Sequence, residues 1–594
     1  SVSTVDATET AKGIVELATA AETTTGTDKT RAVHPAGLTA ALTFTQSGAG
    51  AKPRSHDSKL KDVVSVKDFG AVGDGVADDR PAIQAAIDSL VATGGIVYMP
   101  SGTYRIGTSG GTSGGKSYGL LLKSKVSLVG AAVGTTTIKA GNALSADVIR
   151  AGVGSALFDV TLSDFTLDGN QANQPGPSYG MNFLLSAVTD LTLENLKSLN
   201  TAEWGFGIIE CDRVHISNIT CRHPAHGAAD GIHFRDTSNV TGGSLNIQSA
   251  GDDGFIIEAF SKDVKNYALS GIYVNTQNGL GLIPRGILIL GDHNILTAKR
   301  TVSNITLSSC VVENSSGSGV GVEGVSFQNS YIEALVAGGV SKYGMFLTPG
   351  VPGFTGAFTN NTFKIAISNI AGDGLICVDN TGTFSDNHID LKVYNPGNNK
   401  AGAGLKGDSW TGSIDINYNP NGDKTLFGYG LVVDGDYNNI FVACKGSGTG
   451  ILLQGTAQNN TFKLGRLRNN ATIDLSITAG SANNSFHGGA ITSLVHHGGP
   501  TNKFYGVGGA TTYGSVAVDF ATLANGIAEF NHGLLGNPAG VSIGVAAIGA
   551  PSNADIWEVI SSDPLTKIAI YMKDSSTGAA IKSGKFTVRY FASL

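Results

Sequence analysis

Apolar residues recur along the middle of the chain in a triplet spaced i, i+2 and i+5, often followed by a polar turn. The triplet appears as Val160/Leu162/Phe165, Leu191/Leu193/Leu196, Val214/Ile216/Ile219, Leu245/Ile247/Ala250, Ile305/Leu307/Cys310 and Ile365/Ile367/Ile370. An Asn-rich turn before phenylalanine recurs as NNTF (360–363), NNIF (438–441), NNTF (459–462) and NNSF (483–486). Period-2 pairs, a corner and a return predict the coils of a parallel β-helix with stacked Asn ladders. A β-propeller is the competing all-β fold, but its blades need about 40–50 residues each, and the closest copies of the Asn turn are about half as far apart.

Outside this repeat the pattern changes, so we expect three domains: residues 1–60, 61–506 and 507–594. The first is a Thr- and Ala-rich segment, and the last alternates apolar and polar residues as in KFTVRYFAS, which predicts a β-sandwich. Near the start of the repeat, Asp79 precedes Arg80-Pro81, and a helical apolar face ends at Gly94-Gly95. An N-cap residue and an early proline predict a helix that caps the open end of the β-helix. The expected fold class is therefore all-β with one N-terminal capping helix.

Composition and charge narrow the function. The 594 residues include 82 glycines, which suits many tight turns, and the net charge of −7 argues against nucleic-acid binding. No apolar run approaches the roughly 18 residues that would insert into a membrane. Five cysteines are sparse and odd in number, so we expect buried thiols rather than a disulfide framework. There is no CxxC or HExxH spacing, and we expect neither a metal nor another cofactor.

An acidic cluster is the main candidate for chemistry. Asp230 lies in AADGIHF (228–234), one repeat before Asp252 and Asp253 in GDDGFII (251–257). One coil advances the helix by about 4.8 Å, so these carboxylates should stack on one wall, with flanking glycines that aim the pair outward. Glycosidic-bond cleavage needs one protonated and one ionised carboxyl, and mutual repulsion would raise one pKa. The alternative is that the pair caps a turn or binds a structural cation.

Neighbouring residues are candidates for substrate binding. Glu210 lies about one coil before Asp230, and His226 and His233 flank the acidic cluster. Each has a structural alternative, because exposed glutamates are common on strands and His233 alternates with apolar residues. Three aromatic residues could stack on sugars or simply pack in the core: Trp204, Tyr273 and Trp410.

Three segments resemble known families. Residues 9–42 resemble a short module of phage tail fibres and tailspikes, and residues 66–106 resemble the opening of the pectate-lyase-like, right-handed β-helix superfamily in tailspikes. ADGI followed by GDDGFII is similar to the NTDGI…GDDCI signature of polygalacturonases, which are inverting hydrolases. That likeness implies that Asp230 and Asp253 activate water and that Asp252 is the general acid. Where that family has Gly-His-Gly this chain reads GLG (279–281), and Arg285 or Arg300 would replace the family's Arg-Ile-Lys motif.

These resemblances imply a phage tailspike that depolymerises a bacterial capsular polysaccharide, exopolysaccharide or O-antigen by hydrolysis. They also imply a homotrimer that joins the phage tail through its N-terminus and acts at the host cell surface. The C-terminal domain would support trimerisation or bind carbohydrate. Two alternatives remain open: a polysaccharide lyase, which needs a uronic acid and a suitable base, and a receptor-binding spike without catalysis.

Overall fold

The computed structural model describes residues 16–505 with short gaps, and beyond them Val507 and six strands between 511 and 593. The gaps are residues 114, 153, 176–179, 224–229, 249–250, 277–283, 292–299, 351–354, 379–381, 398–399, 419–427, 456, 469, 471–472, 479, 490, 492–493 and 497–501. Among the described residues, no helix has the length and apolar character needed to cross a bilayer.

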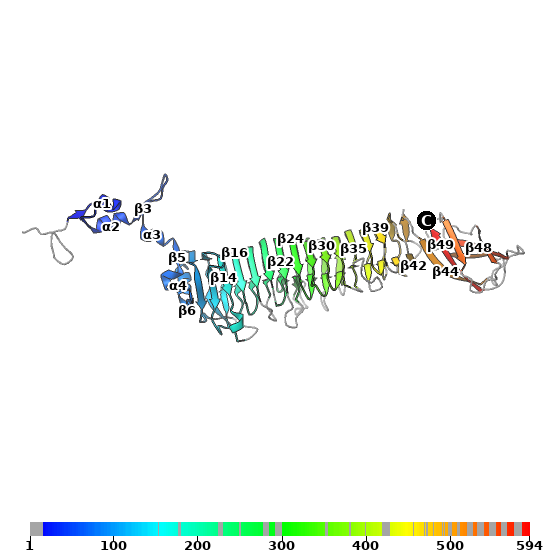
Figure 1. The fold of residues 1–594 in the computed structure, drawn as a ribbon, viewed down its shortest axis with the longest axis horizontal. Coiled ribbons are helices and arrows are strands. Elements are labelled where there is room, and N and C mark those ends of the chain that lie inside the picture. The colour runs from blue at the N-terminus through cyan, green and yellow to red at the C-terminus, as the bar shows by residue number, and fades with distance from the viewer. Residues whose placement is uncertain are drawn as a thin grey trace, which may run out of the picture.

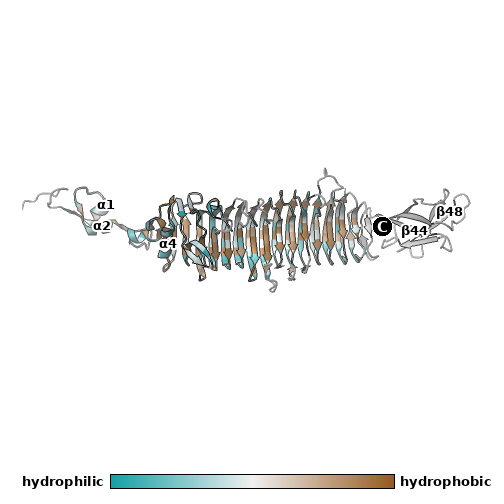
Figure 2. Ribbon diagram, turned by 90° about the horizontal axis from the view of Figure 1, so that it is seen from below, coloured by the Kyte–Doolittle hydropathy of each residue, from teal (hydrophilic) through white to brown (hydrophobic). Residues whose placement is uncertain are grey.

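The central part of the chain is a β-solenoid of about 13 turns, seen as a row of stacked arrows in Figure 1. Two long parallel sheets run along it, and apolar residues follow the strands (Figure 2). The predicted parallel β-helix is therefore confirmed. Coil length varies more than the sequence repeat suggested: Leu193 pairs with Ile216 across a short coil, whereas Leu269 pairs with Leu307 across a much longer one.

The first sheet contains the long strands that carry the triplets. Its strands are β5 (Val63–Ser65), β6 (Asp74–Asp78), β7 (Gly95–Met99), β8 (Gly102–Ile106), β11 (Val126–Gly130), β12 (Thr136–Ala140), β14 (Leu157–Asp168), β16 (Val188–Leu199), β18 (Asp212–Arg222), β20 (Ser238–Gln248), β22 (Val264–Asn275), β24 (Thr301–Glu313), β26 (Ser326–Gln328), β27 (Tyr331–Ala337), β29 (Ala357–Thr359), β30 (Thr362–Ser368), β32 (Thr383–Ser385), β33 (His388–Tyr394), β35 (Thr411–Asn417), β37 (Asn439–Lys445), β39 (Thr461–Arg468), β41 (Ser485–His487) and β43 (Lys503–Tyr505).

The second sheet carries the acidic cluster at the start of its strands. Its parallel strands are β10 (Lys116–Leu121), β13 (Asp147–Ala151), β15 (Phe183–Ser186), β17 (Phe206–Ile209), β19 (Ile232–Arg235), β21 (Phe255–Ala259), β23 (Ile287–Gly291), β25 (Ser318–Glu323), β28 (Tyr343–Thr348), β31 (Asp373–Cys377), β34 (Ala403–Lys406), β36 (Tyr429–Asp434), β38 (Thr449–Leu453), β40 (Ile473–Ile477) and β42 (Leu494–His496). At its N-terminal edge, β9 (Gly111–Ser113) pairs antiparallel with β10.

A left-handed residue explains the i, i+2, i+5 triplet. In β14, Val160 and Leu162 point into the core by alternation, and Asp164 then adopts φ 64°, so that Phe165 also points inward. Asn195 in β16 turns the chain in the same way, with φ 49°. Each long strand is thus two strands joined by a corner.

Two of the six triplets were assigned in the wrong register. Leu245 pairs with Ile219, the third member of an earlier triplet, and Ile365 aligns through β27 with Cys310, also a third member. Both sets therefore begin at the corner rather than before it. The last residue of the first of these sets, Ala250, lies outside the described residues.

The stacked Asn-rich turns form the predicted ladder. Asn361 donates from Nδ2 to Oδ1 of Asn387 at 3.0 Å, and Asn460 donates to Asn484 at 2.9 Å. These side chains are at most 1% exposed. A buried amide must be hydrogen-bonded, and stacking identical amides satisfies each one with its neighbour.

The capping helix is α4 (Arg80–Ser89), which buries Ile83, Ala86 and Ile87 against the first coil. Asp79 stands at its N-cap position but makes no side-chain bond to the helix. Its carboxylate instead accepts the backbone N–H of Val72 at 2.6 Å, together with those of Gly73 and Arg105. The helix was predicted correctly, whereas the capping role of Asp79 was wrong, because this buried acid ties the loop before the helix to strand β8.

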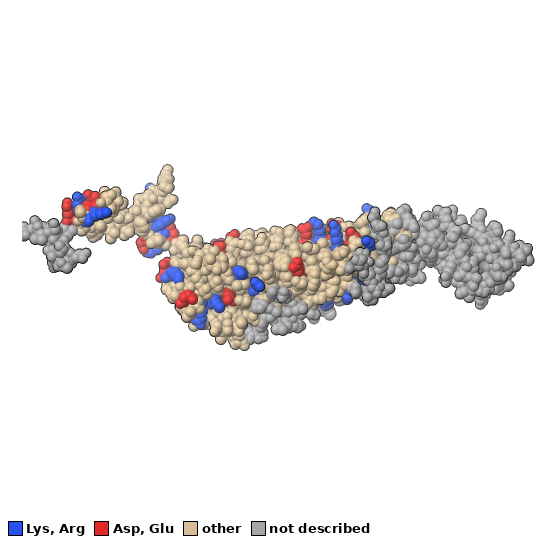
Figure 3. Space-filling model, in the orientation of Figure 1, with Lys and Arg blue, Asp and Glu red and all other residues tan. Residues whose placement is uncertain are grey.

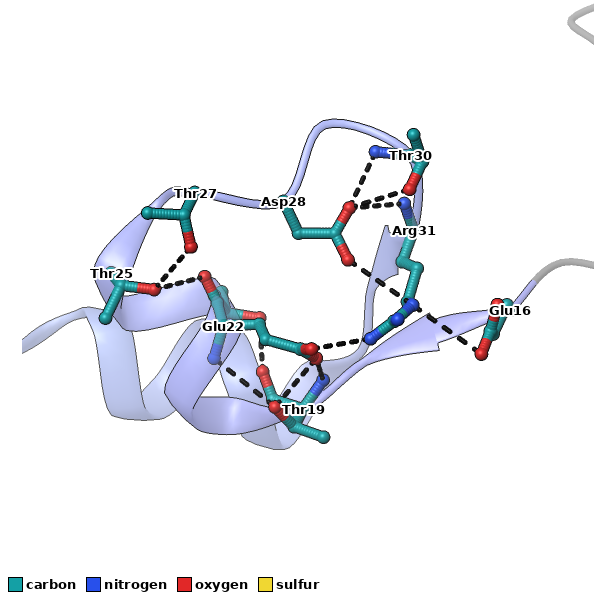
Figure 4. Close-up of polar contacts among 9 residues, drawn as sticks. Glu16, Thr19, Glu22, Thr25, Thr27, Asp28, Thr30 and Arg31 are labelled. Atoms are coloured by element: carbon teal, nitrogen blue, oxygen red, sulfur yellow. Dashed lines mark hydrogen bonds and ion pairs between the residues drawn. The ribbon is translucent and has the colours of Figure 1, made fainter.

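The N-terminal segment contains short elements: β1 (Leu17–Ala18), α1 (Ala20–Thr25), β2 (Ala32–Val33), α2 (Pro35–Ala41), β3 (Thr43–Phe44), β4 (Arg54–Ser55) and α3 (His56–Leu60). Thr19 and Glu22 form a reciprocal capping box at the start of α1. Arg31 lies among three acids and contacts Glu22 at 2.6 Å (Figure 4). These polar contacts stabilise α1 and the turn that follows it.

Beyond the solenoid, the described strands pair with one another in antiparallel fashion, although the first of them also pairs in parallel with β42. β44 (Thr511–Asp519) pairs with β49 (Lys585–Ser593), which pairs with β46 (Gly540–Val545). β48 (Lys567–Asp574) lies between β45 (Ile527–Asn531) and β47 (Ala554–Val559). The change from parallel to antiparallel pairing agrees with an all-β C-terminal region, while the exact domain boundaries stay a prediction.

Candidate functional site

The three aspartates gather at the start of neighbouring strands of the second sheet. Ile232 of β19 pairs with Phe255 of β21, so Asp230 stands beside Asp253 on the next coil. One carboxylate oxygen from each of Asp230, Asp252 and Asp253 lies within 4.8 Å of the others. The predicted stacking on one wall is what the structure shows.

A glycine column explains why these acids sit between glycines. A Cβ on Gly231 would lie 2.5 Å from the carbonyl oxygen of Gly254, and one on Gly254 would lie 2.7 Å from that of Gly286. The glycines therefore allow successive coils to approach closely as they enter the strands. They do not turn both acids outward as expected, since Asp253 is only 6% exposed and Asp252 alone is half-buried.

Asp230 and Asp253 each hold the next coil in place. Asp230 Oδ1 accepts the N–H of Asp253 at 3.2 Å, and Asp253 Oδ1 accepts the N–H of Arg285 at 2.7 Å. Asp147 and Asp373, at the equivalent positions of other coils, also accept the N–H one coil on, at 3.0 and 2.7 Å. The alternative that these acids serve the structure therefore holds in part. Asp230 and Asp253 accept a backbone N–H in the same way as acids outside the cluster.

Asp252 differs from its two neighbours. Within the described part of the chain, its side chain makes no hydrogen bond or ion pair. Burial, followed by the charge of Asp230, raises the pKa of Asp252 to about 6. Burial and the charges of Asp230 and Asp252 also raise the pKa of Asp253. The pKa of Asp253, the more deeply buried of the two, is raised well above the usual value of a carboxyl, so the pair holds a proton more tightly than isolated carboxyls would; Asp252 is the half-buried member, which a ligand can reach.

A buried chain of charges runs from Asp230 along the outer face of the sheet. His233 Nδ1 lies 2.9 Å from Asp230 Oδ2, and His233 Nε2 lies 3.0 Å from Glu258 Oε2, to which Arg235 Nε also donates. Burial alone would lower the pKa of His233, but the hydrogen bonds to Asp230 and Glu258 outweigh it and raise this pKa. Trp204 stacks on the imidazole with 3.9 Å between ring centroids. The two carboxylates thus favour the protonated form of this histidine and fix the orientation of its ring.

Other predicted residues have mixed outcomes. Arg285 lies at the site, between Asp253 and Glu323, whose Oε2 is 3.2 Å from Arg285 Nη2. Glu210 was placed wrongly: it follows β17 at the opposite end of the strand and pairs with Lys262 at 3.1 Å. The register error arose because Trp204, rather than Glu210, stands one coil before Asp230. His226 and the GLG sequence lie outside the described residues.

Two of the three candidate aromatic residues have structural roles. Trp410 is fully buried in the core, and Tyr273 donates its hydroxyl hydrogen to Glu313 at 2.8 Å. Sequence reasoning missed Glu258, the counter-charge of His233 and Arg235. Its signal was an acid at an outward-facing position of the apolar strand FIIEA, which is unusual because a buried carboxylate needs a partner.

The donor set suits a proton relay better than a cation. Three carboxylate oxygens within 4.8 Å have the chemistry of a Ca²⁺ or Mg²⁺ site. Asp230 and Asp253 already use oxygens to accept backbone N–H groups, and the guanidinium of Arg285 lies 3.8 Å from Asp253. The residues therefore do not fit a structural cation.

The family model that matches this chain covers the same region. Residues 63–282 match the family model described as rhamnogalacturonase A/epimerase, pectate lyase-like. Mannuronan C5-epimerase AlgE5 of Azotobacter vinelandii is 37% identical over 250 residues, which is 38% of this chain and 24% of that protein. Alginate lyase 7 of the same organism is 47% identical over 116 residues, 19% of this chain and 13% of the lyase. The chain thus spans a quarter or less of the length of these relatives.

Solved structures show the fold over nearly the whole chain. A double mutant of the tailspike protein of E. coli bacteriophage HK620 has a TM-score of 0.55 at 13% identity, covering 94% of this chain and 98% of the tailspike. Another mutant of that tailspike, in complex with a pentasaccharide, has a TM-score of 0.54 at 14% identity with the same coverage. The resemblance to the pectate-lyase-like β-helices of tailspikes is therefore confirmed at the level of the fold.

Proposed function

We propose that this chain is a phage tailspike that depolymerises a bacterial surface polysaccharide by hydrolysing its glycosidic bonds. The observation that carries the proposal is the pairing of one half-buried carboxyl of raised pKa, Asp252, with two anchored carboxylates. The names of the relatives refer to mannuronan and alginate, and one tailspike neighbour was solved with an oligosaccharide. All of these concern polysaccharides.

In the proposed reaction, Asp252 gives its proton to the glycosidic oxygen as the bond from that oxygen to the anomeric carbon breaks. Asp230, oriented by its contact with His233, takes a proton from the attacking water, whose hydroxyl joins the anomeric carbon. Asp253 stands beside both groups and keeps the coil spacing through its bond to the N–H of Arg285. Capsule, exopolysaccharide and O-antigen all remain candidate substrates, because the aspartates recognise a bond type rather than a sugar.

Inversion is the expected stereochemistry, and it follows from the likeness to polygalacturonases. Opposed carboxyls that hold a water between them are about 6.5–9.5 Å apart, whereas retaining enzymes place them about 5–5.5 Å apart. The oxygens of this cluster lie within 4.8 Å of one another, which is nearer the retaining spacing, so inversion is proposed on the likeness to polygalacturonases alone. Nuclear magnetic resonance of the first-formed anomer decides: a retained anomer would assign a carboxylate as nucleophile and overturn inversion.

Lyase or epimerase chemistry is the second candidate, favoured by the names of the relatives. Such chemistry needs a base that removes a carbon-bound proton. Both nitrogens of His233 are occupied by acids, and Arg235 and Arg285 are paired with Glu258 and Glu323. The described cationic residues of the site therefore offer no ready neutral base, and this favours hydrolysis.

The test is incubation with purified capsules from a panel of bacterial hosts, followed by mass analysis of the fragments. Hydrolysis adds one water for each bond broken, elimination leaves an unsaturated sugar that absorbs ultraviolet light, and epimerisation leaves chain length unchanged. Tight binding without shortening would instead identify a receptor-binding spike.

We also propose a homotrimer that attaches to the phage tail through the N-terminal segment. The proposal is supported by the tailspike fold and by that segment itself, in which Ala18 and Gly37 are the buried residues of β1, α1, β2 and α2. Leu17 and Leu38 are half exposed or more, so association would bury them. Light scattering should give three times the chain mass; a monomer at micromolar concentration would contradict the proposal.

A further inference from the structure

A cavity lies on the same wall of the solenoid as the aspartates, nearer the capping helix. Its volume is about 380 Å³, and it is lined by Lys116 and Ser117 of β10, by residues 145–147 at the start of β13, and by two glycines. The strand pairings place Asp147 three coils before Asp230 in the same column. At about 4.8 Å a coil, the two acids are roughly 14 Å apart along the axis.

Asp147 has an unused polar atom at this cavity. The residue is 1% exposed, and its Oδ1 accepts the N–H of Met181 at 3.0 Å. Its Oδ2 is buried and has no hydrogen-bond partner among the described residues, although Arg150 Nη1 stands 3.5 Å away. A buried oxygen without a hydrogen-bond partner destabilises the fold, so a ligand hydroxyl that donated to it would recover that energy.

An ion pair connects this cavity with the catalytic wall. Lys116 Nζ contacts Glu203 Oε1 and Oε2 at 3.1 and 2.8 Å. Glu203 directly precedes Trp204, which stacks on His233 beside the aspartates. The charges of Lys116 and Arg150 disfavour a metal ion here, while hydroxyl groups find both donors and acceptors. On the face of the molecule that Figure 3 shows, the charged side chains of the solenoid are scattered, without a long stripe of one sign.

We propose that this cavity is a subsite that binds one sugar unit of the polymer through its hydroxyl groups, several units from the bond that is cleaved. The polymer would then lie along the solenoid axis, from Asp147 past Trp204 to Asp252. The inference rests on the proposed function, and it adds a requirement: fragments long enough to reach from the aspartates to the cavity bind more tightly than shorter ones.

The test uses the full chain in an Asp252→Asn background, so that binding is measured without cleavage. Capsular polysaccharides of the host panel are broken by partial acid hydrolysis, fractionated by length and titrated by calorimetry. Lys116→Ala removes one donor, and Ser117→Tyr fills the cavity. Both should weaken the binding of long fragments about tenfold and leave that of short fragments within twofold. Lys123→Ala, a half-exposed lysine outside the lining, is the matched control and should change neither.

Equal affinity of long and short fragments for the unsubstituted cavity would overturn the subsite. Equal losses of affinity for long and short fragments in the two variants would also overturn it, since that result would indicate an effect on folding. Failure of the proposed function looks different: every polymer would stay intact and unbound with the unaltered protein, and both proposals would fall. Cleavage by the unaltered protein without length dependence would remove the subsite alone.

Discussion

Replacing Asp252 by Asn should lower activity and raise stability at neutral pH. Loss of a general acid typically costs 10²–10⁴-fold in rate, which is about 3–5.5 kcal/mol of transition-state stabilisation. The stability effect has the opposite sign because the folded protein must hold the ionised carboxylate close to Asp230. With a pKa of about 6 in place of the ordinary 3.8 of an aspartate, ionisation costs up to roughly 3 kcal/mol, and solvent screening of the half-exposed carboxylate reduces this to about 1–2 kcal/mol.

The pH dependence follows from that sign. The folded-state pKa is raised, so between about pH 4 and 6 the folded protein binds more protons than the unfolded chain, and its stability falls as pH rises. The Asn variant lacks this loss, so its advantage should be absent below pH 4 and complete above pH 6. Turnover of the unaltered protein should fall about tenfold per pH unit above 6 as Asp252 loses its proton.

Reducing-end release and urea unfolding midpoints, both measured from pH 4 to 8, test this pair of effects. Asp373→Asn is the matched control, because Asp373 occupies the same column on a distant coil and accepts a backbone N–H at 2.7 Å. It should leave turnover within twofold. An Asp252→Asn protein that retains turnover, or that loses activity only in proportion to folded protein, would refute the assignment of Asp252 as the acid.

Further predictions address the neighbouring groups. Asp253→Ala should destabilise the protein by about 1–3 kcal/mol, because it leaves the N–H of Arg285 without its acceptor; faster exchange of that amide is the readout, and unchanged exchange would contradict it. His233→Gln should move the alkaline limb of the rate profile to higher pH by removing a cation that lowers the pKa of Asp252; an unmoved limb with a reduced rate would indicate a purely structural histidine. The five cysteines are buried, so thiol reagents should label them only after denaturation, and labelling of the native protein would contradict the burial.

The solenoid was predictable because its coils repeat one physical requirement. Val160, Leu162 and Phe165 must all reach the core, and the spacing records both strand alternation and the corner between the second and third residues. Register was harder to predict, because Ile365 and Ile367 satisfy the same spacing after the corner. Apolar identity shows that a residue points inward, but not which side of the corner it occupies.

The stacking of the aspartates was predictable from the same repeat, whereas the residues that pair with their neighbours were not. Asp230 and Asp253 fall one coil apart, so the repeat alone brings them together. Glu258 lies further along the same apolar strand, and nothing in the repeat connects it with His233. Whether such an acid is paired depends on which outward positions lie side by side. That in turn depends on the lengths of the coils, which the loops set and which differ widely along the solenoid.

Aspartates at the start of the second sheet's strands share one hydrogen bond to the backbone, so an aspartate at this position is not by itself a sign of catalysis. Asp147, Asp230, Asp253 and Asp373 all accept the N–H one coil on, so an acid at this position can be required by the fold alone. What distinguishes the candidate site is the extra residue, Asp252, which makes no such bond among the described residues and yet lies within the field of two anchored carboxylates. A group with no structural partner that is held where its charge is disfavoured lowers stability, and such a cost is common where a group serves chemistry. Of the acids in this cluster, Asp252 therefore has the strongest physical argument for a catalytic role.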